Sequence, residues 1–143
     1  MPSANGRNRI LVVASLFTVL LVPAAAAQQA PQPGAVVFSQ NKCPFENVPR
    51  VNAALDSILA PVLDEFVAEG KLLAWGVLEH GWGDEWNWNI YYTVESHRTF
   101  LDFWSAYVAR LNERHPGWFA QFAPLCTEHK DNIYSVRVAR PQR

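Results

Sequence analysis

The sequence lacks an excess of charge of either sign. It contains 12 Lys and Arg residues against 13 Asp and Glu residues, which gives a formal net charge of -1 at pH 7. Proteins that bind nucleic acid usually carry a basic excess or a basic stripe on one face. The composition gives no support to a nucleic-acid partner, and we expect none.

The sequence also lacks the short motifs that mark common catalytic sites. It has no G-x-S-x-G nucleophile turn, no G-x-x-x-x-G-K phosphate loop, no G-x-G-x-x-G dinucleotide loop and no H-E-x-x-H zinc motif. No repeat of fixed period is present either, which excludes a solenoid. A functional site must therefore be inferred from where the fold places the polar residues.

No apolar run is long enough to cross a membrane. The run at residues 10–22 is shorter than the roughly 20 residues that a spanning helix needs, which argues against an uncleaved anchor. It follows Arg7 and Arg9 and precedes four consecutive alanines at residues 24–27. A positive start, an apolar core and a small-residue end define a secretory signal. We predict a signal peptide at residues 1–27 and a secreted or periplasmic protein that has no membrane contact after cleavage.

Cysteine is scarce, and both cysteines, Cys43 and Cys126, lie beyond the predicted signal peptide. In an oxidising compartment a single pair predicts a disulfide, with free thiols or metal ligands as the alternatives. Aromatic residues are abundant by contrast, with six Trp and eight Phe. They indicate a dense core, a subunit interface or a pocket lined by rings.

The chain beyond the signal peptide alternates strand and helix patterns. We expect a disordered linker at residues 28–34, one domain at residues 35–140 and a tail at residues 141–143. Within the domain we predict strands at 35–41, 71–79, 86–94 and 132–139, and helices at 51–67 and from 96 to about 115. Pro61 should kink the first helix. Tyr134, Val136 and Val138 should alternate towards the core.

The order strand, helix, strand, strand, helix, strand predicts an α+β, ferredoxin-like fold. In this arrangement a four-stranded antiparallel sheet carries two helices on one face. With right-handed crossovers, the first and last strands lie side by side and antiparallel, which would bring Cys43 and Cys126 together.

The same topology gathers several polar residues at one edge of the sheet. The expected members come from the hairpin between the middle strands, the end of the second helix and residues 126–134: Glu79, His80, Asp84, Glu85, His115, Glu128, His129, Lys130 and Asp131. We select His129 and His80 as candidate catalytic bases, with Asp131 or Glu128 orienting the His129 ring. A solvated cluster of turn residues without a function is the alternative. We predict no metal site, since the spacing of metal-binding motifs is absent.

The aromatic strands provide candidate ligand-binding residues. Trp88 and Asn89 belong to the run WNWN, and Asn89 could orient a ligand in a cavity lined by Trp75, Tyr91 and Trp104. The alternative is that the tryptophans only fill the layer between the sheet and the helices.

The topology, length and aromatic strands, with the segment CTEHKDNIY at residues 126–134, resemble the dimeric α/β-barrel superfamily in an exported form. The resemblance implies a homodimer in which two sheets pack face to face. The superfamily includes cofactor-free and haem-degrading monooxygenases, isomerases and members without known activity. Haem-degrading members use an Asn, a Trp and a His, but their spacing does not match this sequence, so no catalytic residue is carried over.

Two functional hypotheses follow from the resemblance. The first is an exported binding or interaction domain that holds a small apolar or aromatic molecule, with His129 and Asn89 as polar contacts. The second is a monooxygenase-like enzyme that acts on a small aromatic substrate with His129 or His80 as base. We expect no cofactor, and haem or a metal ion remains the alternative.

Overall fold

The computed structural model describes residues 32–80, 82 and 85–138. The predicted signal peptide, the linker up to residue 31 and the tail at residues 141–143 lie outside these residues. The strands are β1 (Ala35–Lys42), β2 (Ala74–Glu79), β3 (Trp88–Val94) and β4 (Glu128–Ser135). The helices are α1 (Val48–Ala54), α2 (Ala60–Ala68), α3 (His97–Arg114) and α4 (Trp118–Phe122). Shorter helical turns are η1 (Phe45–Asn47), the π-helical η2 (Leu55–Leu59) and η3 (Ala123–Leu125).

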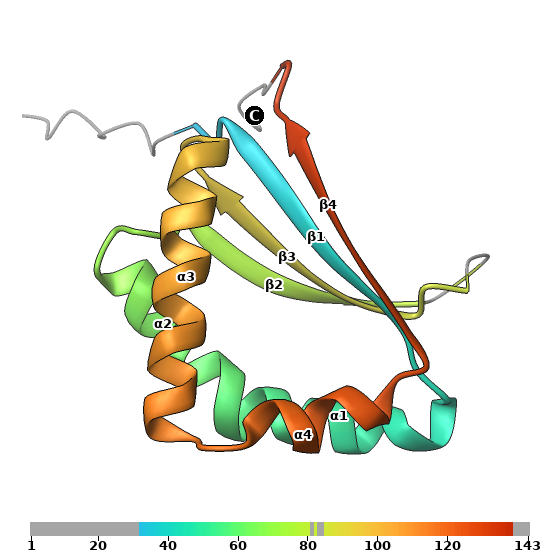
Figure 1. Ribbon diagram of the computed structural model, residues 1–143. Helices are drawn as coiled ribbons and strands as arrows, with labels where there is room; N and C mark the ends of the chain where they lie inside the picture. The colour runs from blue at the N-terminus through green and yellow to red at the C-terminus, as the bar shows by residue number, and fades with distance from the viewer. Residues whose placement is uncertain (1–31, 81, 83–84, 139–143) are drawn as a thin grey trace, which may run out of the picture.

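The four strands form one antiparallel sheet in the order β2-β3-β1-β4. The helices cover one face of this sheet, and the other face is left open (Figure 1). The predicted α+β, ferredoxin-like fold is therefore confirmed. The predicted disulfide between Cys43 and Cys126 is also present, at the end of β1 where β4 begins.

The two faces of β1 differ in burial. Residues alternate between buried side chains on the helix face and half-buried side chains on the open face. The buried set begins with Ala35 and Val37 and continues with two polar residues, Ser39 and Asn41. Sheet pairing starts before β1, since the Gly34 N–H donates to the Val94 carbonyl and the Gly34 carbonyl accepts from Val136. Gly34, which we expected in the disordered linker, is thus held in the sheet.

The first predicted helix is divided by the π-helical turn η2. Pro61 has no N–H to donate and its ring crowds the carbonyl of Ser57, so a regular helix cannot continue through this point. The wider turn precedes Pro61 and accommodates it. The ribbon changes direction between α1 and α2 (Figure 1), which agrees with the predicted kink.

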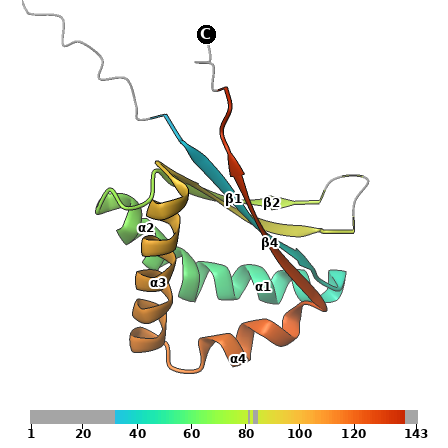
Figure 2. The same cartoon turned by 45° about the horizontal axis from the view of Figure 1, so that its top comes forward.

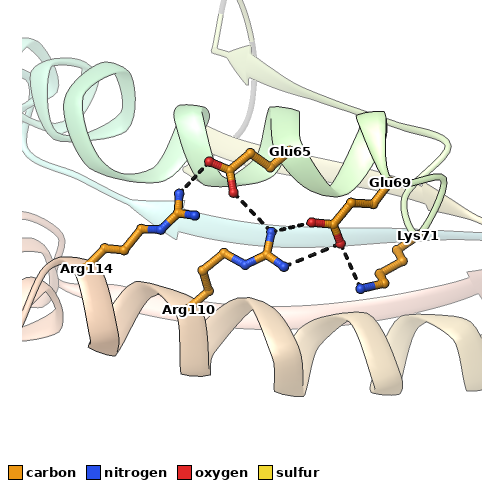
Figure 3. Close-up of polar contacts among 5 residues, drawn as sticks. All are labelled: Glu65, Glu69, Lys71, Arg110 and Arg114. Carbon is orange, nitrogen blue, oxygen red and sulfur yellow. Dashed lines mark hydrogen bonds and ion pairs between the residues drawn. The ribbon is translucent and has the colours of Figure 1, made fainter.

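Ion pairs join α2 to α3 on the outer side of the helix layer (Figure 3). The Arg110 guanidinium lies 3.1 Å from Glu65 and 2.8 Å from Glu69, and Arg114 also contacts Glu65. Lys71 pairs with Glu69 at 2.7 Å. The hydrogen bond from Arg110, followed by that from Lys71, lowers the pKa of Glu69 to about 2. Because most of these side chains are partly exposed to solvent, the network contributes more to fixing the position of α3 against α2 than to stability.

The last strand begins earlier than the sequence predicts. We expected it at residues 132–139, but β4 spans Glu128–Ser135, so most of the polar segment 126–134 is strand rather than loop. Tyr134 and Val138 were expected to face the core and are instead 52% and 68% exposed. β4 is an edge strand. Backbone hydrogen bonds pair it with β1, and this pairing does not depend on apolar side chains.

None of the helices in the described part of the chain combines the length and the apolar character that a bilayer crossing requires.

Candidate functional site

A cavity of about 170 Å³ lies between the helix face of the sheet and the helices α3 and α4. In Figures 1 and 2, α4 follows the end of α3 and leads towards the start of β4. The sheet contributes Ser39, Asn41, Ile90, Tyr92, Glu128 and His129, and the helices contribute Leu59, Trp104, Tyr107, Trp118, Phe119, Phe122 and Ala123, with Cys126 between them.

Most of the residues that the helices contribute to the cavity are aromatic. The Trp104 ring lies 6.1 Å from Tyr92 and 5.7 Å from Tyr107, measured between ring centroids. The Trp118 indole N–H donates to the Asn112 Oδ1 at 3.1 Å, which fixes the ring orientation. Rings held in this way can pack against a flat apolar molecule.

The polar edge of the cavity comes from β1 and β4. The His129 Nδ1 lies 3.1 Å from the Asn41 Oδ1, and its Nε2 lies 3.1 Å from the Asp131 Oδ2. The Asn41 amide group donates to the Ser39 carbonyl at 3.3 Å, so its Oδ1 is an acceptor. Both partners of the imidazole are acceptors, and both contacts are hydrogen bonds only when both ring nitrogens carry a proton.

This geometry decides what His129 can do. An imidazole protonated on both nitrogens is a donor and a positive charge, and it has no free lone pair to accept a proton. The Nε2 becomes a base only if its contact with Asp131 opens. The expectation that Asp131 orients the His129 ring agrees with the 3.1 Å contact, whereas Glu128 pairs with Lys42 at 3.2 Å instead.

Two tyrosines, Tyr92 and Tyr107, line the cavity and are almost fully buried. Burial raises the pKa of Tyr107 well above its usual range, so the phenol stays protonated. Burial also raises the pKa of Tyr92, and the nearby Tyr107 hydroxyl and Asp131 carboxylate add to the effect. The Tyr107 oxygen has no hydrogen-bond partner among the described residues. A buried hydroxyl without a partner costs free energy of folding.

The π-helical turn also contributes to the site. Leu59, its last residue, is buried and lines the cavity. Single π-helical turns inside α-helices occur often at functional sites.

The predicted ligand-binding residues do not form one site. Trp104 lines the cavity, but Trp88 is fully buried in the core and its indole N–H donates to Asn52 at 2.8 Å. Asn89 and Tyr91 alternate with Trp88 and Ile90 along β3 and point to the open face. Trp75 packs beside α2, where its indole N–H donates to Asp64 at 2.9 Å. A shared cavity for Asn89, Tyr91 and Trp75 is therefore wrong, because successive strand residues face opposite sides.

The predicted gathering of rim residues is confirmed only in part. Lys42 joins Glu85 of the hairpin to Glu128 of β4, at 2.9 and 3.2 Å. His80 lines another pocket, together with Lys42, Cys43, Phe45, Glu85 and Asn87. His80 and His129 thus lie in different pockets and do not form an acid/base pair.

His115 was also expected at this rim. It follows α3 directly, and the helical segments α4 and η3 separate it from β4 along the chain. Asp84 lies outside the described residues. Within the described ranges, no three His, Cys, Asp or Glu side chains lie close enough together to bind a metal ion.

Several cavity residues were missed from the sequence. Tyr107, Trp118 and Phe122 were assigned only to helix packing, although they line the cavity. Ser39 and Asn41 were not singled out. Both lie on the same face of β1 as the core residue Val37. Polar residues at every second position after a core residue are a signal that could have located the polar edge of the cavity.

No family model matches this sequence, and no curated protein matches it significantly. Solved structures do match. A dimeric ferredoxin-like protein from an uncultured marine organism has a TM-score of 0.63 at 9% identity, over 80% of this chain and 96% of its own. The haem degrader MhuD from Mycobacterium tuberculosis has a TM-score of 0.57 at 14% identity, over 75% and 99% of the two chains. The chain shares its fold with these proteins.

A third structure with this fold is an uncharacterized NIPSNAP domain protein from Burkholderia xenovorans, with a TM-score of 0.54 at 12% identity, over 76% of this chain and 99% of its own. The MhuD structure contains two haems in its active site. The cavity described here does not fit haem. An engineered cavity of about 150 Å³ accommodates benzene, so 170 Å³ suits one aromatic ring and not a tetrapyrrole. Both His129 nitrogens are also engaged by protein groups.

Proposed function

We propose that this protein is an exported domain that binds a small aromatic molecule in the cavity between the sheet and the helices α3 and α4. The observation that carries the proposal is the composition of the cavity, in which aromatic rings face a polar edge made by Asn41 and His129. Ligand sites in proteins are concave and largely apolar, with a few polar groups that orient the ligand.

Binding is favoured over catalysis by the contacts of His129. Both ring nitrogens face acceptor oxygens of the protein, so neither is free to take a proton from a bound molecule while these contacts hold. A monooxygenase-like activity on a small aromatic substrate is the alternative. It is supported by the His129–Asp131 pair beside the cavity and by the fold shared with a haem degrader. Oxygen consumption with quinol-type substrates would support this alternative, and no uptake would count against it.

The binding proposal predicts that filling the cavity abolishes binding. Ala123 lines the cavity and follows α4, so an Ala123→Phe substitution places a ring in the space that the ligand would occupy. We expect at least a tenfold loss of affinity for a single-ring probe such as toluene, or about 1.4 kcal/mol. Isothermal titration calorimetry measures the loss.

The matched control is Ala120→Phe. Ala120 lies on α4 and is exposed, but it is not among the residues that line the cavity. This variant should bind toluene as the unchanged protein does. Equal affinities for both variants, or no binding of toluene to the unchanged protein, would contradict the proposed site.

We also propose that the protein is a homodimer formed through the open face of the sheet. Three rings cluster there, with Phe38 lying 6.4 Å from Tyr91 and 5.9 Å from Tyr134 between centroids. Leu78 on the same face is 47% exposed. An exposed apolar patch of this kind is typical of an interaction surface, and one of the matching structures is described as dimeric.

A charge at the centre of this patch should prevent association. We expect sedimentation velocity to show a dimer for the unchanged protein and a monomer for Phe38→Glu, because burying an unpaired carboxylate is strongly unfavourable. Leu101→Glu is the matched control. Leu101 is 56% exposed on α3, away from the open face, and its substitution should leave the dimer intact. If Phe38→Glu sediments as a dimer, the two sheets do not meet at this face.

Export is the remaining part of the proposal. It is supported by the signal-like residues 1–27 and by the disulfide, since disulfides persist mainly in oxidising compartments.

A further inference from the structure

The residues that line the cavity differ in how far solvent reaches them. Ser39, Ile90 and Tyr92, which the sheet contributes, are buried. Four other lining residues are exposed: Phe119, Ala123, Glu128 and His129. A side chain that lines a cavity and also faces solvent lies at the opening of that cavity. The cavity therefore opens between the segment formed by α4 and η3 on one side and the start of β4 on the other.

Phe119 is the bulkiest apolar residue at this opening. It lies on α4, is 63% exposed, and its ring lies edge-on to the Trp118 ring at 5.5 Å between centroids. Trp118 is only 9% exposed, and its indole N–H donates to Asn112. Because most of the Phe119 ring stays in solvent, its burial contributes little to folding. Trp118 thus belongs to the wall of the cavity, and Phe119 to its opening.

The opening is the direction in which a larger molecule would have to extend. The volume of about 170 Å³ is close to that of an engineered cavity of about 150 Å³ that binds benzene, so one ring fills the cavity. The buried lining residues belong to the packed core, and forcing further atoms against them is unfavourable. The second ring of a fused system would therefore extend towards solvent, where the Phe119 ring lies.

We propose that Phe119 sets the size limit of the site. Its ring covers the solvent side of the cavity and restricts binding to molecules with one aromatic ring. This inference rests on the proposed binding function and adds a residue that determines specificity. When the ring is removed, the cavity lengthens towards solvent, whereas the buried part that holds the first ring of a ligand is unchanged.

Toluene and indole are probes with one ring and with two fused rings. The size selectivity of the protein is the ratio of the dissociation constant of indole to that of toluene, measured by isothermal titration calorimetry. In Phe119→Ala the second ring of indole can occupy the space that the phenyl ring leaves. We expect the ratio to be about tenfold lower in this variant than in the unchanged protein, mainly because indole binds more tightly. Indole is measured on both proteins, so its N–H group does not contribute to the change.

Phe45→Ala is the matched control. Phe45 is 76% exposed and lines the other pocket, with Lys42 and His80, rather than the cavity. Removing the same phenyl ring there should leave the ratio unchanged. Thermal unfolding without ligand gives a second readout. Since both rings lie largely in solvent, each variant should unfold close to the melting temperature of the unchanged protein. A large loss of stability in Phe119→Ala would show that this ring belongs to the core and would overturn the inference.

The outcomes separate this inference from the proposed function. If toluene binds both the unchanged protein and Phe119→Ala and the ratio is the same, the size limit is wrong and the binding function stands. If Phe119→Ala loses toluene and gains no affinity for indole, Phe119 is a ligand contact and the size limit is again wrong. If neither probe binds either protein, both proposals are wrong.

Discussion

Removing the disulfide between Cys43 and Cys126 is expected to lower the free energy of unfolding by about 4 kcal/mol. The two cysteines are separated by 83 positions in the sequence, so the bond closes a long loop and strongly restricts the unfolded chain. Small domains are stable by only about 5 to 15 kcal/mol in total. The double substitution Cys43→Ala, Cys126→Ala should therefore leave a protein that is partly unfolded at moderate urea concentrations.

The loss should also reach the cavity. Cys126 lines it, and the bond ties the end of β1 to the segment between η3 and β4, next to Phe122 and His129. Urea unfolding monitored by tryptophan fluorescence measures the stability. The unchanged protein treated with a reductant is the control, because it keeps both side chains and breaks only the bond. A loss below about 1 kcal/mol in both samples would mean that the bond restrains little of the unfolded chain.

Replacing Trp88 by alanine is expected to cost about 3 to 5 kcal/mol of stability, the usual range for a buried tryptophan. The Trp88 side chain is fully buried, and its indole N–H donates to the Asn52 Oδ1. Alanine leaves a large void and removes the donor that satisfies Asn52. Guanidinium unfolding measures the change.

Two variants identify the cause of this loss. Trp75→Ala removes the same side chain from a half-buried position in β2, and it should cost clearly less. Trp88→Phe keeps most of the core filled. Since Trp88 does not line the cavity, this variant should bind toluene with unchanged affinity. A folded Trp88→Phe protein that no longer binds toluene would show that Trp88 is a ligand contact after all.

The fold was predictable because its main signals are local and strong. The helical spacing of apolar residues located α1, α2 and α3, and the Ser96 side chain caps α3 as expected by accepting a hydrogen bond from the Thr99 N–H. The handedness of the crossovers then placed β1 beside β4, which brought Cys43 to Cys126.

The site was less predictable because it depends on register. β4 contains few core side chains, so its start and its pairing of His129 with Asn41 depend on backbone hydrogen bonds with β1 that no apolar pattern reveals. The same limit applied to β3, where the sequence showed two alternating faces but not which of them a cavity would use. Trp88 was therefore assigned to ligand binding and Tyr107 to packing, and the structure places only Tyr107 at the cavity.

The π-helical turn at Leu55–Leu59 has a consequence for comparing this chain with others. A turn of this kind holds one residue more than a regular α-helical turn. A homologue whose first helix is regular would match this sequence only with a one-residue gap within residues 55–59. Without that gap, each residue after the turn would be equated with the position of its next neighbour, so Leu63, which is fully buried here, would be equated with the exposed position of Asp64.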